Sequence, residues 1–179
     1  MVDQKTLDKA YMECAYAIGR MSYAERKKVG AILVSPEDGI ISEGFNGTPT
    51  GFENVCEFSE PGCVHDLYLD VATQKTRCFN CEDSWSMYSR ESNKDREYKL
   101  VTKPEVLHAE SNAITKVAKS TRSSRGATLY VTCQPCLECA KLIIQAGIVR
   151  VVFDEPYRLN DGIDLLNKAG INLKRYEIT

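Results

Sequence analysis

Two short motifs, far apart in the chain, restrict its fold more than any other feature of the sequence. The first is His108-Ala109-Glu110, and the second is Pro135-Cys136-Leu137-Glu138-Cys139. Each opens a segment whose apolar residues recur at helical spacing. Residues at i and i+3 share one face of a helix, so the two thiols can reach a single ion. The fold must therefore bring two helix N-termini together.

The residue types in these motifs predict a catalytic zinc site. His108, Cys136 and Cys139 supply three ligands, which leaves the fourth position of a tetrahedral zinc open for water. Glu110 is not needed as a ligand, and it can carry protons between that water and a substrate. The combined H-x-E…P-C-x-x-C pattern is the signature of zinc-dependent nucleobase deaminases, in which Glu110 would be the catalytic residue. The alternatives are a structural zinc with Cys133 as fourth ligand and a non-catalytic zinc-binding module, which give Glu110 no role.

Composition indicates a soluble globular protein that acts on small molecules. The chain has 179 residues, a formal net charge of -2 and a pI near 5.8, so no basic field attracts nucleic acid. A deaminase acting on tRNA or single-stranded DNA is the main alternative, and it would need a basic groove. There is no signal peptide or membrane-spanning run, and the eight cysteines fit a reducing compartment, so we expect a cytoplasmic protein.

Hydrophobic periodicity predicts strands that alternate with helices, which is typical of an α/β sandwich around a mixed sheet. In the first helix the predicted buried face is Leu7, Tyr11, Cys14, Ala15 and Ile18. In the third helix Leu142 and Ile143 are predicted to point inward. The expected helices are 4–22, 108–120, 136–146 and 162–169, and the expected strands are 29–34, 39–44, 127–132, 149–153 and 171–176.

Residues 53–106 interrupt this pattern, and we interpret them as an insertion with short helical pieces in a single domain covering 1–179. The insertion is rich in groups that bind metals. A C-x-x-C and a C-x-H close together fit a second, structural zinc, although buried thiols or a disulfide remain alternatives. The candidate ligands are Cys56, Cys63, His65, Cys78 and Cys81.

Outside the insertion, the sequence resembles the deoxycytidylate (dCMP) deaminases of phages and eukaryotes. The resemblance implies a three-layer α/β/α sandwich around a five-stranded mixed sheet, as in the cytidine deaminases. It also implies a hexamer that converts dCMP to dUMP for thymidylate synthesis, in the host cytoplasm if the protein is phage-encoded. The matching segments are 29–31, 44–49, 108–110, 112–114, 127–132, 135–141 and 144–148.

The same resemblance implies allosteric control, with dCTP and Mg²⁺ activating and dTTP inhibiting. The family's effector loop is Gly-Tyr-Asn-Gly, and here Phe45 replaces the tyrosine. The predicted substrate residues are Asn46, Ala109 and Tyr157, with Tyr157 stacking on the pyrimidine. The predicted effector residues are Ser42, Glu43, Gly44, Phe45, Asn46 and Gly47. Each prediction has an alternative. The loop could be a simple turn, Tyr157 could be an ordinary half-exposed aromatic residue, and the protein could be a deaminase of free cytidine.

Overall fold

The computed structural model describes residues 2–61, 67–70, 75–78 and 98–177. The chain divides into two compact units, Met1–Cys56 with Pro104–Thr179 and Glu57–Lys103. That the second unit is an insertion into a single domain stays a prediction.

A five-stranded mixed sheet forms the centre of the first unit, with the strand order β2-β1-β7-β8-β9. Strand β1 pairs antiparallel with both β2 and β7, whereas β8 runs parallel to β7 and to β9. The predicted mixed sheet is confirmed. The strands are β1 (Gly30–Ser35), β2 (Gly39–Phe45), β7 (Thr128–Cys133), β8 (Arg150–Glu155) and β9 (Asn172–Arg175).

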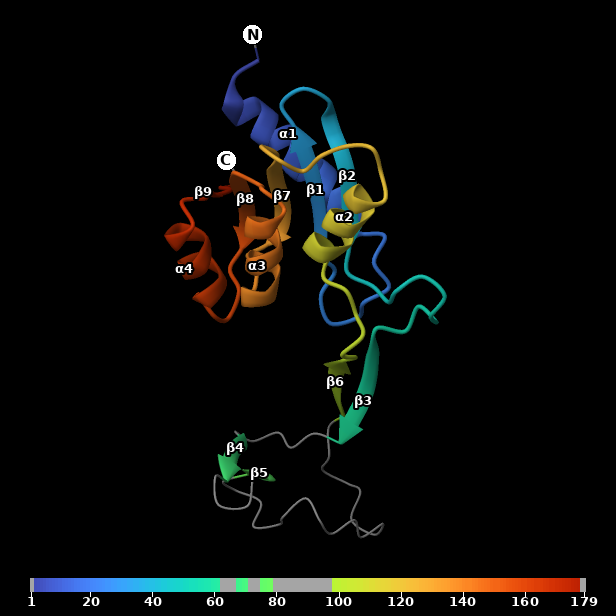
Figure 1. Cartoon of the computed structure of the whole chain (residues 1–179). Coiled ribbons are helices and arrows are strands. Elements are labelled where there is room, and N and C mark those ends of the chain that lie inside the picture. The colour runs from blue at the N-terminus through green and yellow to red at the C-terminus, as the bar shows by residue number, and fades with distance from the viewer. Residues whose placement is uncertain (1, 62–66, 71–74, 79–97, 178–179) are drawn as a thin grey trace. The chain divides into compact units, whose positions relative to one another are not determined.

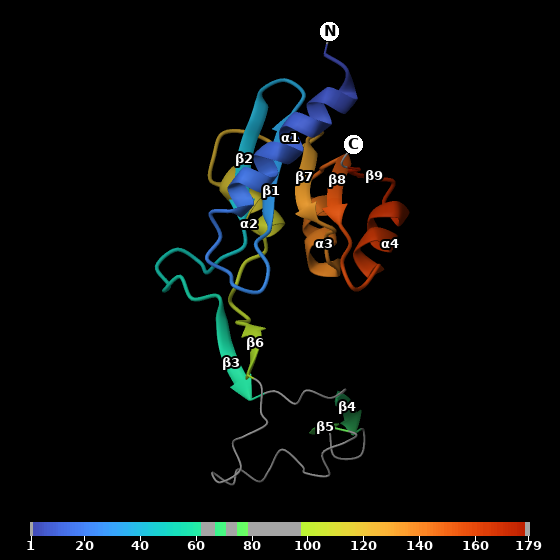
Figure 2. The same ribbon diagram turned by 180° about the vertical axis from the view of Figure 1, so that it is seen from behind.

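Helices cover both faces of this sheet. One face carries α1, which Figure 2 shows in front of the strands, and the other carries α2, α3 and α4, in front in Figure 1. The three-layer prediction is therefore correct. The helices are α1 (Gln4–Gly19), α2 (Ala109–Ala118), α3 (Leu137–Gln145) and α4 (Asp161–Lys168).

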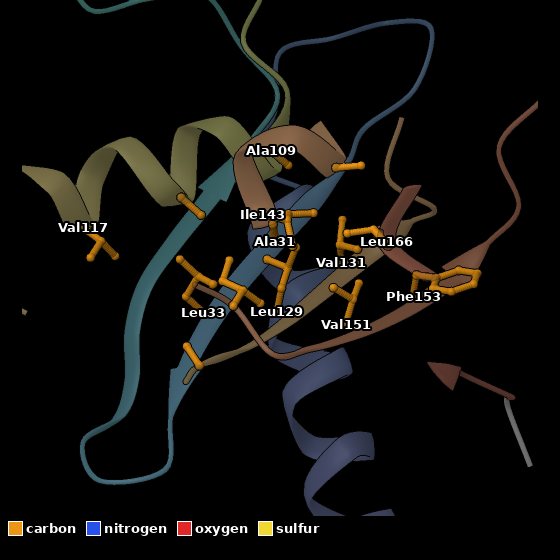
Figure 3. Close-up of a cluster of buried hydrophobic side chains, with 14 of the residues drawn as sticks. Ala31, Leu33, Ala109, Val117, Leu129, Val131, Ile143, Val151, Phe153 and Leu166 are labelled. Carbon is orange, nitrogen blue, oxygen red and sulfur yellow. The ribbon is translucent and has the colours of Figure 1, made fainter. Parts of the chain in front are cut away.

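Alternation along the strands divides the core into two clusters, because successive side chains of a strand point to opposite faces. In β1, Ala31 and Leu33 pack toward α2, α3 and α4, while Ile32 and Val34 pack toward α1. Figure 3 shows the first cluster, where Leu129 and Val131 of β7 lie beside the β1 side chains. The central strands are thus apolar on both faces, as their continuous apolar sequences indicate.

Two predicted helix faces need correction. In α1 the buried face is Asp8, Met12, Ala15 and Gly19, whereas Cys14, which we predicted to be buried, is exposed. In α3 Ile143 is fully buried, but Leu142 is exposed. Both segments contain more apolar residues than one helix face can bury, so periodicity alone did not locate the buried face.

The buried carboxylate of Asp8 connects α1 to the sheet. The two terminal guanidinium nitrogens of Arg150 donate to it at 2.7–2.8 Å, and Lys174 Nζ, the Tyr130 hydroxyl and Gln4 also donate. Burial opposes ionisation of Asp8, but these donors outweigh it and hold the pKa of the carboxyl well below its usual range. Its charge is therefore paired with cations from β8 and β9.

The second unit is built from strands among its described residues. Its strands are β3 (Glu57–Pro61), β4 (Leu67–Asp70), β5 (Lys75–Cys78) and β6 (Tyr98–Thr102). Strand β3 pairs antiparallel with β6, and β4 with β5. The prediction of short helical pieces is wrong for these segments, which are strands. Strand β3 finds its partner about 40 residues along the chain, and such pairing leaves no local sequence signal.

Within the described part of the chain, no helix combines the length and the apolar character that a bilayer crossing requires.

Candidate active site

The structure brings His108, Cys136 and Cys139 together at one end of the sheet. His108 is the N-cap residue of α2, and Cys136 is the N-cap residue of α3, which begins shortly after β7 ends at Cys133. The Nδ1 atom of His108 lies 3.4 Å from Cys136 Sγ and 3.3 Å from Cys139 Sγ. All three ligand atoms lie within 4.8 Å of one another, so they form one cluster.

This cluster fits a tetrahedral zinc ion in both donor type and spacing. Zinc bonds of about 2.0 Å to nitrogen and about 2.3 Å to sulfur place those atoms about 3.5 Å apart at tetrahedral angles. Nearby hydrogen bonding favours the ligand form of the Cys136 thiol, whereas the hydrogen bond with Cys136 raises the pKa of the Cys139 thiol. Hydrogen bonds from Cys139 and from His108 lower the pKa of Cys136 to about 3, against the effect of burial.

Cys133, the alternative fourth ligand, is not part of the metal-binding group found among the described residues. Its Sγ atom accepts a hydrogen bond from Lys27 Nζ at 3.1 Å, and the same ammonium group pairs with Glu155 at 2.8 Å. Burial raises the pKa of the Cys133 thiol. Three protein ligands are therefore present, which is the number found in catalytic zinc sites.

Glu110 lies in the first turn of α2 with 4% of its surface exposed. Burial raises the pKa of its carboxyl to about 7. A carboxyl group with a pKa near neutrality can both accept and return a proton at working pH, which is what an acid-base residue requires. The arrangement is therefore suited to proton transfer beside a zinc-binding cluster.

The segment predicted to bind effectors packs β2 against α2. The Ser42 hydroxyl is buried and donates to the Ala113 carbonyl at 2.8 Å, and Glu43 pairs with Lys116 at 2.9 Å. Gly44 is needed for this packing, since a Cβ there would lie 2.2 Å from the Ala109 carbonyl oxygen. The absence of a side chain at Gly44 thus lets β2 approach the backbone of α2. An effector role for this segment stays a prediction.

Two further residues of the loop also contact the body of the first unit. The Phe45 carbonyl accepts from Asn112 at 2.9 Å, and the Lys116 ammonium lies 5.9 Å from the centre of the Phe45 ring. The Gly47 backbone exchanges two hydrogen bonds with Leu107, immediately before His108. The loop is therefore attached at both ends to the segment that starts α2.

The Asn46 amide holds the segment that leads into β1. Its Oδ1 atom accepts from the Val29 N–H at 2.8 Å, and its Nδ2 atom donates to the Lys27 carbonyl at 2.8 Å. One N–H of the amide is left over, so contact with a substrate sugar remains a prediction that this geometry permits.

The other predicted substrate residues are Ala109, next to the ligand His108 in the chain, and Tyr157, which follows β8. Ala109 is fully buried between His108 and Glu110 in the sequence. Tyr157 is half-buried, two residues after β8, and the Arg158 guanidinium lies 5.7 Å from the centre of its ring. Stacking of Tyr157 on a pyrimidine stays a prediction.

The second zinc site falls largely outside the described side chains. Cys63, His65 and Cys81 lie outside the described residues, and of Cys78 the structure describes only the backbone in β5. Cys56 is buried at the end of its part of the first unit.

Sequence reasoning did not identify the contact of Lys27 with Cys133 and Glu155, or the buried Gln134. Both depend on contacts between the ends of β7 and β8 and distant loops. The apolar β7 sequence followed by Gln134-Pro135 was the only local signal that a polar residue lies beside the metal motif.

Comparison with known proteins assigns the family. A family model described as "Cytidine and deoxycytidylate deaminase zinc-binding region" matches residues 5–155. The chain is 34% identical over 167 residues to the deoxycytidylate deaminase of Enterobacteria phage T4, covering 90% of this chain and 86% of the relative. It is 32% identical over 172 residues to the human deoxycytidylate deaminase, covering 93% of this chain and 77% of the relative.

A solved structure agrees with these sequence matches. The dCMP deaminase from the cyanophage S-TIM5, crystallised in complex with dCMP and dUMP, is similar with a TM-score of 0.71 and 33% identity, covering 98% of this chain and 100% of that chain. The predicted cytidine deaminase-like fold is thereby confirmed. The chain belongs to the deoxycytidylate (dCMP) deaminase family of hydrolases, within the cytidine and deoxycytidylate deaminases.

Proposed function

We propose that this protein catalyses the hydrolytic deamination of dCMP, in which dCMP and water give dUMP and ammonia. The observation that carries the proposal is the buried Glu110 beside the cluster of His108, Cys136 and Cys139. Family membership supports the choice of substrate, because the similar cyanophage enzyme was crystallised with dCMP and dUMP. The product would supply thymidylate synthesis.

The residues of the site divide the reaction between them. His108, Cys136 and Cys139 would hold the zinc, which supplies a Lewis acid that makes hydroxide available near neutral pH. Glu110 accepts the proton that the water loses and delivers it to the ring nitrogen next to the reacting carbon. It then takes the proton of the hydroxyl group now bonded to C4 and transfers it to the amine, which leaves as ammonia while the C4 carbonyl forms. Glu110 is thus restored at the end of each turnover.

Three residues are proposed to hold the substrate. Tyr157 stacks on the pyrimidine. It follows β8, which runs parallel to β7, and β7 leads to the zinc ligand Cys136. Aromatic side chains after these two strand ends are suited to stacking on a base. Asn46 contacts the sugar through its remaining amide N–H, and Ala109 contributes at the start of α2.

We also propose regulation and assembly of the kind implied by the resemblance. dCTP with Mg²⁺ activates, dTTP inhibits, and residues 42–47 form the effector site of a homohexamer in the cytoplasm. The support is the match of this segment to the family's effector loop and its direct packing on α2, which carries His108 and Glu110. An effector at β2 could therefore displace the catalytic residues by moving α2.

The substrate is tested by ammonia release from dCMP, deoxycytidine, single-stranded DNA and tRNA under the same conditions. We expect release from dCMP alone at a substantial rate. Equal turnover of deoxycytidine would indicate an enzyme that ignores the phosphate, and release only from a polymer would overturn the proposal.

Regulation is tested by the rate at subsaturating dCMP with dCTP and Mg²⁺, and with dTTP, while light scattering gives the oligomer mass. The proposal expects a higher rate with dCTP, a lower rate with dTTP and a hexamer. A rate that neither effector changes would contradict it.

A second, structural zinc with its ligands among Cys56, Cys63, His65, Cys78 and Cys81 is proposed from their spacing alone. Metal analysis of the purified protein should give two zinc ions per chain, whereas one zinc ion would exclude this site.

A further inference from the structure

The segment that joins β8 to α4 packs against residues 134–136, which lead into the zinc ligand Cys136. Gln134 lies between β7 and Pro135, and its side chain is buried, with 6% of the residue exposed. Its backbone N–H donates to the Glu155 carbonyl at 2.8 Å, and its Nε2 atom donates to the Leu159 carbonyl at 3.0 Å. Gln134, the residue before Pro135, is therefore hydrogen-bonded both to the end of β8 and to the segment just before α4.

Gly162 completes the support from the first turn of α4. A Cβ atom at this position would lie 2.3 Å from the Pro135 carbonyl oxygen and 2.8 Å from the Cys136 carbonyl carbon. Real Cβ atoms do not approach backbone this closely, so only a hydrogen atom fits between α4 and the peptide that joins Pro135 to Cys136. The buried Gly162 thus sets how closely α4 approaches that peptide.

This support matters because the zinc ligands come from separate elements. His108 is held at the start of α2, and Cys136 at the start of α3, so their 3.4 Å separation depends on where each helix begins. A shift of a few tenths of an ångström at Cys136 would change its distance to His108 while leaving Cys139, one turn further along α3, partly in place. Groups behind metal ligands commonly change metal affinity in this way.

We propose that Gln134 and Gly162 are positioning residues for the zinc ligand Cys136, and that the β8–α4 segment determines the zinc affinity of the site. The proposal rests on the zinc site of the proposed function, but not on the identity of the substrate. Neither residue is expected to touch the ion or the reacting atoms.

The experiment compares Gly162→Ala and Gln134→Met with the wild type by competition for zinc against a coloured chelator. The added Cβ pushes the Pro135–Cys136 peptide, and methionine keeps the length of the glutamine side chain while removing both donors. We expect each variant to bind zinc about 10- to 100-fold more weakly. Asn167→Ala, at an exposed position of the same helix, is the matched control and should bind zinc like the wild type.

A second measurement separates positioning of Cys136 from a general loss of stability. Cobalt substituted for zinc absorbs through bands that report the thiolate ligands and the geometry. A merely less stable protein keeps the wild-type spectrum in its folded fraction, whereas displacement of Cys136 shifts or weakens the thiolate-to-cobalt band. We expect the altered spectrum for both variants and the unaltered spectrum for Asn167→Ala.

Wild-type zinc affinity and cobalt spectra in both variants would overturn the proposal. If Gly162→Ala does not fold, as circular dichroism would show, Gln134→Met decides by itself. Neither measurement uses dCMP, so this inference can be confirmed even if the protein does not deaminate dCMP. A wild-type protein that binds no zinc would refute the zinc site on which the inference rests.

Discussion

Two buried carboxylates show how local environment assigns different tasks to the same chemical group. Asp8 is surrounded by donors from Arg150 and Lys174, so it stays ionised and links α1 to the sheet. Burial dominates the environment of Glu110 and raises the pKa of its carboxyl to about 7. The first group is suited to structure and the second to proton transfer.

Replacing Glu110 with glutamine should preserve zinc binding and abolish most turnover. Glutamine is nearly the same size but cannot accept a proton, so we expect kcat to fall by at least about a hundredfold. Initial rates with dCMP and metal analysis of the same sample check this. Glu138→Gln, at an exposed position of α3, is the control and should retain its rate. A Glu110→Gln enzyme with a normal rate would exclude Glu110 from the mechanism.

Asp8 should make the protein sensitive to acid. Because its pKa is lower in the folded than in the unfolded protein, its contribution to stability is complete above the unfolded pKa of about 4 and is lost as pH falls toward the folded pKa. Asp8→Asn should lower the free energy of unfolding by about 3 kcal/mol at pH 7, since Arg150 and Lys174 lose their partner.

Denaturant unfolding from pH 7 down to pH 3 measures this effect. The difference between wild type and Asp8→Asn should shrink as the pH falls below about 4. A difference that stays constant over this range would show that ionisation of Asp8 is not the source of the stability.

At the scale of elements, the contact of β2 with α2 connects the loop of residues 44–47 to the catalytic helix. Gly44→Ala would place a methyl group against the α2 backbone, and we expect it to lower the free energy of unfolding by about 1–3 kcal/mol. Gly47→Ala is the control, because its Cβ would make only ordinary contact with the Phe45 ring. Equal unfolding midpoints in denaturant for both variants would contradict this account of the β2–α2 packing.

The elements also show what the sequence could predict. The helix start at Cys136 could be located, because zinc ligands at i and i+3 and a proline before them leave a local signature. The start at His108 could be located because apolar residues recur at helical spacing after it. The pairing of β3 with β6 could not, since its contacts span about 40 residues. Nor could the burial of Gln134, which depends on the carbonyl of Leu159 in a distant loop.

At the scale of the whole molecule, the five-stranded sheet brings the metal-binding cluster and two predicted functional residues to one end. The carboxyl ends of β7 and β8 lead to Cys136 and Tyr157, and the start of α2 adds His108 and Glu110. The alternation of strands with helices along the sequence predicted the α/β sandwich, and the three layers were predicted from the resemblance to the dCMP deaminases. The side-chain contacts of the loops, such as those of Lys27 with Cys133 and of Gln134 with Leu159, could be found only from the structure.

Removal of zinc should affect activity and stability together. Treatment with a strong chelator should abolish turnover and lower the unfolding temperature, because an ion bound only by the folded state stabilises it. Zinc should restore both properties, and magnesium should restore neither. Full activity after verified removal of zinc would contradict the assignment of His108, Cys136 and Cys139.

The most direct test of the central claim is to identify the product formed from dCMP in water enriched in oxygen-18. Hydrolysis at the zinc site predicts dUMP that carries one oxygen-18 at C4, with one ammonia released for each dUMP, as mass spectrometry and an ammonia assay would measure. Unchanged dCMP, or dUMP without the label, would contradict the account.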